Sequence, residues 1–261
     1  MSFEIIDFHT HPFIKKENNI CSHKDFFEMD TEHTKTVFDD LGVSKICGSV
    51  VSGAKAEDES FWERIVRNNN TALQLRDMYG EFYVPGFHVH PDFVDESIGE
   101  ISRMKKLGVN LIGELVPYMD GWRDYSCEGF SEILNEAGRQ NMIVNVHTME
   151  NDAMDIMVKN HKDVIFVAAH PGEYSDLMRH IERMKMSENY YIDISGTGIF
   201  RYGMLRRAIE EFGADRILFG SDYPTCNPGM FVGGVLNDNL ISDDDKEKIL
   251  SLNAKRLLGL N

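Results

Sequence analysis

Residues 4–11 read EIIDFHTH, an apolar run that closes on two histidines separated by one residue. Its β-branched and aromatic side chains are typical of a buried parallel strand, and residues two apart on a strand point to the same side. Four later apolar runs also end at or next to a residue that binds metal ions. They are LIGEL at 111–115, IVNVH at 143–147, VIFVAAH at 164–170 and ILFGSD at 217–222. We therefore expect these side chains together at the carboxyl-terminal edge of one parallel sheet.

Strand-like and helix-like patterns alternate along the chain, which favours βα units around a parallel sheet. The expected strands are residues 4–11, 43–51, 82–89, 110–117, 142–148, 164–172, 190–197 and 216–224. The expected helices are residues 30–41, 57–79, 96–108, 129–140, 151–160, 173–187, 201–212 and 244–260. Eight such units in 261 residues predict an α/β fold, a (β/α)8 TIM barrel, formed by a single domain over residues 1–261. Two further segments, 12–29 and 118–129, follow strands directly and are expected over the rim, where loops shape a substrate pocket.

Charge and composition narrow the class of partner. The formal net charge is −16, from 27 Lys and Arg against 43 Asp and Glu, and such a surface repels a phosphate backbone. We therefore expect a small-molecule substrate and no nucleic acid. The start, MSFEIID, lacks the pattern of a leader peptide, and no run of about 18 apolar residues occurs, so neither export nor membrane insertion is expected. Four cysteines without a CxxC pair fit a reducing, cytoplasmic setting.

The strand ends supply the candidate metal ligands. They are His9, His11, Glu114, His147, His170 and Asp222. Histidine and carboxylate ligands suit zinc best, and manganese, iron and cobalt also, so we expect a divalent ion, most simply zinc, with one or two ions per chain. Asp7, inside the first strand, either orients one of the histidine rings or ties down a neighbouring loop.

A second HxH, His88 and His90, closes the third expected strand but is followed at once by Pro91. We interpret it as pocket lining, with His90 closer to substrate, although a structural histidine at a strand end explains it equally well. Arginines in the rim loops are candidates for clamping a carboxylate, because a guanidinium offers two parallel donors, and tyrosines there are candidates for apolar walls. The remaining substrate candidates are Arg123, Arg201, Tyr118 and Tyr223.

FHTH near the start, IGEL in the middle, NVHT, HPG, FGSDYP and the terminal ILxxNAKRLLGL together resemble the amidohydrolase superfamily, most closely its amidohydrolase-related branch of metal-dependent TIM-barrel hydrolases. The resemblance implies that His9, His11 and Asp222 hold the more buried ion. It also implies that His147 and His170 bind a second ion or that one of them acts on substrate. Many family members bridge two ions with a carboxylated lysine on the fourth strand. This chain has Glu114 there, whose two oxygens could form the bridge, and Glu114 therefore favours a site for two ions and hydrolysis. A buried pairing of Glu114 with a cation such as Arg123 is the alternative.

On this basis we expect a metal-dependent hydrolase that cleaves an amide, lactone or ester bond in a small, carboxylate-bearing metabolite. Water activated by the metal would attack, Asp222 would take its proton, and His170 would help polarise the carbonyl group. A zinc-dependent non-oxidative decarboxylase of the same superfamily is the alternative, with one zinc, no bridging group and a catalytic histidine on the sixth strand. A TatD-type deoxyribonuclease and a catalytically silent metal-binding barrel are further alternatives, and a homodimer is left open.

Overall fold

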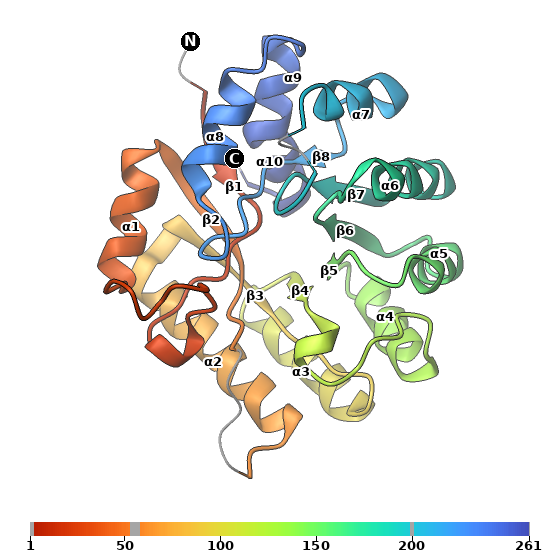
Figure 1. The fold of residues 1–261 in the computed structure, drawn as a ribbon. Helices are drawn as coiled ribbons and strands as arrows, with labels where there is room; N and C mark the ends of the chain where they lie inside the picture. Colours follow the sequence, from red (N-terminus) through yellow and green to blue (C-terminus); the bar gives the residue numbers. More distant parts are fainter. Residues whose placement is uncertain (1–2, 53–57, 199–200, 261) are drawn as a thin grey trace.

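The computed structural model describes residues 3–52, 58–198 and 201–260. Eight parallel strands lie side by side in chain order (Figure 1). They are β1 (Ile5–Asp7), β2 (Val43–Ser49), β3 (Tyr83–Phe87), β4 (Leu111–Leu115), β5 (Ile143–His147), β6 (Ile165–Ala169), β7 (Tyr190–Asp193) and β8 (Ile217–Leu218). Each falls inside a strand expected from the sequence, and the predicted barrel is confirmed.

Hydrogen bonds beyond the strand ends join the last strand to the first. The N–H of Phe8 donates to the carbonyl oxygen of Phe219 at 2.8 Å, and the N–H of Asp222 donates to that of His9 at 2.9 Å. The sheet therefore closes on itself, as a barrel requires. This closure places a metal-ligand candidate from the start of the chain beside one from its end.

Apolar side chains fill both faces of the sheet, as expected for parallel strands. The larger cluster packs strand residues such as Phe87 and Phe166 against helix residues such as Phe130. A smaller cluster gathers residues that include Leu111 and Ile143, which open their strands, and it packs against the C-terminal segment. This cluster closes the amino-terminal end of the barrel, so the opposite rim is left for polar residues.

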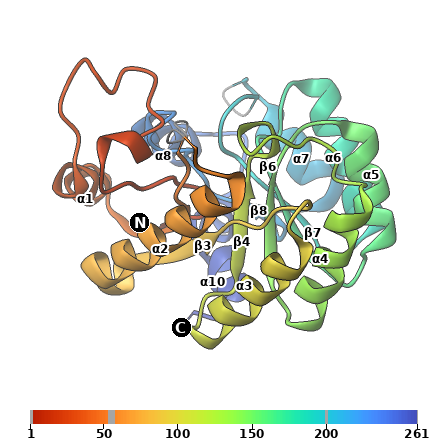
Figure 2. The same ribbon diagram turned by 90° about the horizontal axis from the view of Figure 1, so that it is seen from below.

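Helices surround the sheet (Figures 1 and 2). They are α1 (Thr31–Asp40), α2 (Phe61–Tyr79), α3 (Val94–Lys106), α4 (Glu128–Arg139), α5 (Asn151–Asn160), α6 (Tyr174–Met186), α7 (Met204–Phe212), α8 (Pro228–Leu236), α9 (Asp243–Glu247) and α10 (Asn253–Leu258). Local signals fix several ends. Ser60 and Glu63 form a capping box at the start of α2. Gly108, at φ +78°, follows the end of α3.

Two helices differ from expectation. The closing helix predicted over 244–260 is divided, because a π-helical turn at Lys248–Leu252 separates α9 from α10. Helix α8, with the sequence PGMFVGGVL, was not predicted. Its three glycines and almost wholly apolar composition hide the helical period of polar and apolar residues. The start predicted for the second helix, at residue 57, lies outside the described residues.

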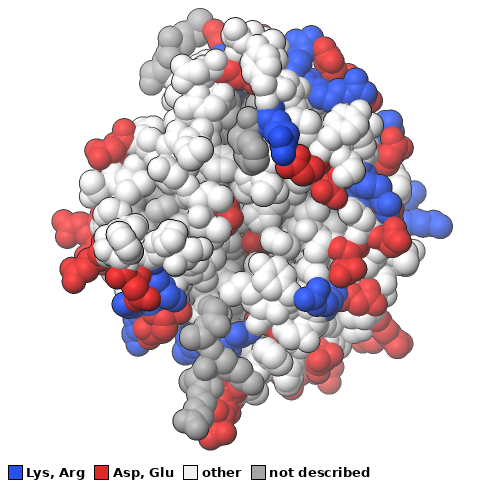
Figure 3. Space-filling model, in the orientation of Figure 1, with Lys and Arg blue, Asp and Glu red and all other residues white. Residues whose placement is uncertain are grey.

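Figure 1 looks onto the rim formed by the carboxyl ends of the strands. The same face in Figure 3 has a central hollow surrounded mostly by uncharged residues, with Lys, Arg, Asp and Glu gathered around the edge. None of the helices in the described ranges is long and apolar enough to cross a membrane.

Candidate metal centre

The structure brings all six predicted metal ligands to one place at the rim. The first set converges on the imidazole Nε2 atoms of His9 and His11, which lie 3.2 Å apart. Glu114 Oε2 is 3.3 Å from the first and 3.1 Å from the second. Asp222 Oδ1 is 3.6 and 3.5 Å from the same two atoms. Four ligand atoms from β4 and from the ends of β1 and β8 thus face one another.

The other ring nitrogens determine the chemistry of this cluster. His11 Nδ1 lies 3.0 Å from the carbonyl oxygen of Ser49, which only accepts, so His11 Nδ1 carries a proton. His9 Nδ1 lies 2.8 Å from the carboxylate of Asp193 and is a donor for the same reason. In the neutral rings both Nε2 atoms then present lone pairs to each other and to two carboxylates. Such a set of acceptors is stable only around positive charge, so the residues present fit a divalent cation.

Glu114 also contacts a second pair of histidines. Its other oxygen, Oε1, lies 2.9 Å from His147 Nδ1 and 3.3 Å from His170 Nε2. The rings of His147 and His170 meet edge to face, with centroids 4.8 Å apart. The carboxylate therefore links the two sets, and the alternative pairing of Glu114 with Arg123 does not occur among the described contacts. Arg123 is exposed and lies 3.9 Å from Glu150.

Burial and neighbouring charges shift the pKa values of Glu114 and His9 in opposite directions. Burial alone would raise the pKa of the Glu114 carboxyl, but the surrounding histidines, His9 foremost, hold that pKa well below 4.5. Burial alone would lower the pKa of His9, yet Asp193 and Glu114 raise it well above 6.5. The cluster therefore attracts positive charge, and protons compete with a metal ion for it.

Asp193 and Ser195 position the histidines, and both were missed in the sequence. Ser195 Oγ lies 3.0 Å from His170 Nδ1 and 3.1 Å from His9 Nδ1, and it bonds to Asp193. Asp193 ends β7 and Ser195 follows two residues later, the same spacing that identified His9 and His11. The sequence YYIDIS, residues 190–195, held the signal, because its two polar residues lie two apart on a strand and so point to the same side. Such partners fix the ring orientation of metal ligands.

Asp7 ties down a loop, the second of its two predicted roles. Its Oδ1 accepts hydrogen bonds from the backbone N–H of His9 at 3.1 Å and of Ser221 at 3.0 Å. It thereby connects β1 to the segment that carries Asp222.

Strained backbone supports two of the ligands. His170 and Asp222 have φ angles of +63° and +61°, which non-glycine residues rarely adopt. Gly196 lies against the His170 ring, and a Cβ there would come within 2.2 Å of His170 Nδ1. Conformations of this kind persist where the surrounding structure enforces them, often at functional sites.

A cavity of about 670 Å³ opens over the cluster. His147, His170 and Asp222 line it, together with Thr148 and Phe231. This size is within the range of small-molecule sites, and three of the ligand candidates are accessible from it.

The structure does not bring the predicted substrate residues to this cavity. His90 is buried, and its Nε2 and Nδ1 are engaged by Asp120 O and by Asp92 N–H. Tyr223 is buried, with its hydroxyl 3.0 Å from that of Thr34. Of the others, Arg201 forms a two-point ion pair with Glu173, while Tyr118 is half exposed with its ring against that of His147. Of these candidates, Tyr118 is in contact with one of the ligand histidines.

Known proteins resemble the chain in sequence and in fold. A γ-resorcylate decarboxylase of Rhizobium radiobacter is 41% identical over 91 residues, which are 35% of this chain and 26% of that protein. The match thus spans about a quarter of the curated relative. The crystal structure of 2,6-dihydroxybenzoate decarboxylase from Rhizobium superposes with a TM-score of 0.80 at 16% identity, covering 99% of each chain. A dihydroxybenzoic acid decarboxylase from Polaromonas with bound manganese has a TM-score of 0.71 at 15% identity, covering 99% of this chain and 97% of that one.

These relatives correct the predicted reaction. The hydrolase expected from the sequence is wrong, because the curated proteins that match in sequence are γ-resorcylate decarboxylases, which favours the alternative reaction. Glu114 was expected to bridge two ions and so to favour hydrolysis. A carboxylate among metal ligands does not by itself determine the reaction. The divalent metal is supported by three groups of residues at the rim whose ligand atoms lie close enough to hold an ion. The family model for amidohydrolases matches residues 6–260, and the chain therefore belongs to the amidohydrolase family of enzymes.

Proposed function

We propose that this protein is a metal-dependent, non-oxidative decarboxylase of a small hydroxylated aromatic carboxylate. The observation that carries the proposal is the set of converging lone pairs at His9, His11, Glu114 and Asp222, which opens on a cavity of about 670 Å³. The segment identical at 41% to a γ-resorcylate decarboxylase supports the substrate class. The uncharged surroundings of the rim hollow fit an aromatic ring (Figure 3).

The metal would be held by His9, His11, Asp222 and one oxygen of Glu114. We propose one ion per chain, because Oε1 of Glu114 is already within hydrogen-bond reach of His147 and close to His170. Manganese is the proposed ion, with zinc, the ion expected from the sequence, as the alternative to be tested. Both accept histidine and carboxylate ligands.

When bound, the ion would supply positive charge that favours binding of an anionic substrate. His170 lines the cavity and is the proposed acid. Burial alone would lower the pKa of His170, but the carboxylate of Glu114 raises it. Ser195 holds the opposite nitrogen of His170 and so fixes the direction of the ring.

The reaction balances without water or an oxidant. His170 gives its proton to the ring carbon that bears the carboxylate. The bond between that carbon and the carboxylate then breaks, its electron pair restores the aromatic ring, and carbon dioxide leaves. His170 regains a proton from solvent. For 2,6-dihydroxybenzoate the product is resorcinol.

The test follows 2,6-dihydroxybenzoate labelled with ¹³C at the carboxyl group, in D₂O, by NMR. The proposal predicts labelled carbon dioxide and resorcinol with one deuterium on the ring. The His170→Gln variant should keep its metal and lose at least about a hundredfold in kcat, the usual range for a general acid. His33→Gln, on the exposed face of α1, is the matched control and should leave the rate unchanged. No labelled carbon dioxide from this or other hydroxybenzoates, with one metal ion bound per chain, would refute the proposal.

A further inference from the structure

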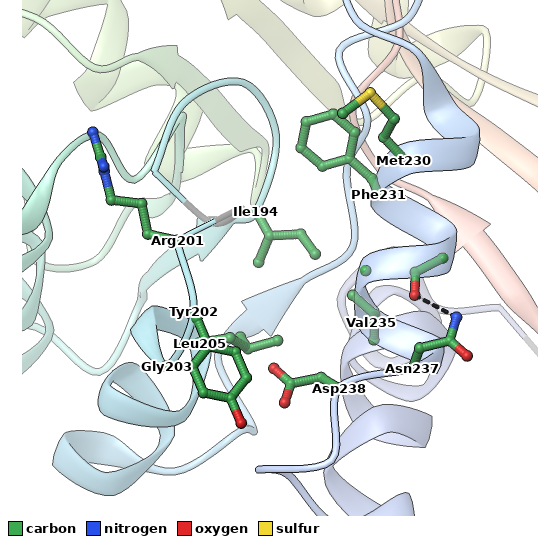
Figure 4. A pocket seen from close by; sticks show the side chains of 12 residues that line it. Ile194, Arg201, Tyr202, Gly203, Leu205, Met230, Phe231, Val235, Asn237 and Asp238 are labelled. Carbon is green, nitrogen blue, oxygen red and sulfur yellow. Dashed lines mark hydrogen bonds between the residues drawn. The ribbon is translucent and has the colours of Figure 1, made fainter.

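A second cavity lies beside the first, between the segment that leads into α7 and helix α8 (Figure 4). Its volume is about 330 Å³, and it shares Met230 and Phe231 with the cavity over the metal ligands. Both residues lie in the first turn of α8. The two cavities therefore adjoin at α8, where Met230 is 71% exposed. An unbranched methionine side chain adapts readily to what lies beside it.

Apolar side chains form most of this second cavity. Ile194, Leu205 and Val235 line it with Phe231, and in Figure 4 Tyr202 and Asp238 lie at the end away from Met230. With about 330 Å³, the cavity is at the lower end of the range of small-molecule sites.

The polar side chains of the lining already have partners. Arg201 pairs with Glu173, and the side-chain amide of Asn237 donates to the carbonyl oxygen of Gly233. The carboxylate of Asp238 accepts the backbone N–H of Leu240, and the hydroxyl of Tyr202 bonds to Asn239. A hydrocarbon group would leave these contacts intact and would bury apolar surface against the lining.

We infer that this cavity holds an apolar substituent on the ring of the substrate, so that the preferred substrate is an alkyl-bearing hydroxybenzoate. The inference rests on the proposed decarboxylation. The carboxylate end would lie at the metal ligands in the first cavity, and the alkyl group would pass Met230 and Phe231 into the second.

Gly234 offers a way to fill the second cavity. It lies on the same face of α8 as Met230 and Phe231, one turn later, and a Cβ there meets no atom within 4 Å. Gly99 in α3 is a matched control, since it is also a helical glycine with open space around an added Cβ. Gly234→Leu and Gly99→Leu therefore change helix propensity equally, and only the first blocks the cavity.

The first measurement is calorimetric binding of resorcinols to the metal-loaded wild-type enzyme, with chains from methyl to hexyl at ring position 4 or 5. In at least one series the affinity should rise by about fourfold per methylene over the first carbons, as expected for burial of hydrocarbon. Gly234→Leu should abolish this rise, and Gly99→Leu should preserve it. An affinity independent of chain length in both series would overturn the inference.

The second measurement is decarboxylation of the corresponding alkyl-substituted 2,6-dihydroxybenzoates. The ratio of kcat/KM between the alkylated and the unsubstituted acid should fall about tenfold or more in Gly234→Leu and stay constant in Gly99→Leu. Turnover of the unsubstituted acid without any gain from an alkyl group would refute the substituent site alone. Absence of turnover for every acid would refute the decarboxylase and leave the chain-length dependence of binding as a separate result.

Discussion

At the scale of single residues, the protonation of four ring nitrogens explains the metal centre. The Nδ1–H groups of His11 and His9 donate hydrogen bonds to Ser49 and Asp193. The Nε2 atom of each ring is therefore the one available to bind the ion. The hydrogen bonds of the two Nδ1 atoms thus fix the orientation in which the histidine rings present Nε2 to the ion.

Replacing His11 should therefore remove the metal without unfolding the barrel. We expect His11→Ala to lose at least tenfold in metal affinity and nearly all decarboxylation, because the site loses one of its neutral ligands. Elemental analysis after dialysis and the rate of carbon dioxide release measure both effects. His33→Ala, which is exposed, is the control. Retention of a full complement of metal in His11→Ala would contradict the assignment.

A histidine outside the site should control the acid stability. His180 is fully buried, and burial, followed by the charge of Arg183, lowers its pKa from 6.5 to about 3. Between these values the unfolded chain binds a proton that the folded chain does not, so the free energy of unfolding falls as pH falls from 6.5 towards 3. The contribution is about 1.4 kcal/mol per pH unit.

His180→Gln should remove this contribution. Urea unfolding of the metal-free protein at several pH values between 7 and 4.5 should give a shallower decline of stability for the variant than for the wild type. Equal slopes would show that His180 is protonated in the folded state too. His33→Gln should retain the wild-type slope.

The ligands were predictable as residues because each one ends a strand, and the strands of a barrel all end at the same rim. Asp193 and Ser195 follow the same rule but end a strand that carries no histidine. The substrate residues were not predictable in this way. Arg123 and Arg201 lie in loops, and Tyr118 lies in a single 3-10 turn, Pro117–Met119. A local partner decides where such side chains point, as Glu173 does for Arg201.

At the scale of elements, the segment after β7 positions the ring of His170, the proposed acid. Gly196 lies against the ring of His170 at φ +65°, so this segment supports the ring only while residue 196 has no side chain.

Gly196→Ala should therefore displace His170 while sparing the four proposed metal ligands. We expect kcat for decarboxylation to fall at least about tenfold with the metal content unchanged, as for other small displacements of catalytic groups. Gly42→Ala is the matched control, because Gly42 has a similar φ of +72° and open space around an added Cβ. Both variants carry the same backbone strain. Equal losses of activity in both would attribute the effect to strain and would contradict the role of the ring contact.

The elements predicted best were those with a regular pattern. All eight strands were recovered because β-branched apolar runs alternate with amphipathic helices. Helix α8 was not recovered, although it borders both cavities, because its sequence lacks polar residues at helical spacing. Packing against the barrel stabilises α8 as a helix, although its sequence alone does not indicate one.

At the scale of the whole molecule, the proposed ion joins the two ends of the chain. His9 and His11 follow β1, Asp222 follows β8, and Glu114 lies halfway between them. Closure of the barrel and binding of the ion thus stabilise the same arrangement.

Removing the metal should therefore lower the thermal stability. At free metal about 1,000 times the dissociation constant, binding to the folded state contributes about 4 kcal/mol, which corresponds to roughly 10 °C in Tm for a chain of this size. Calorimetry before and after chelation, and again after adding Mn²⁺, measures the change. His11→Ala should show no such response. A Tm unaffected by chelation of the wild type would mean that the ion does not link the strands.

The most direct test of metal-dependent decarboxylation is a titration of the metal-free enzyme with Mn²⁺, in which carbon dioxide release from 2,6-dihydroxybenzoate and bound metal are measured on the same samples. Decarboxylation at this site predicts no release without metal and a linear rise that stops at about one ion per chain. Full activity without metal, or no release at full metal occupancy, would contradict it.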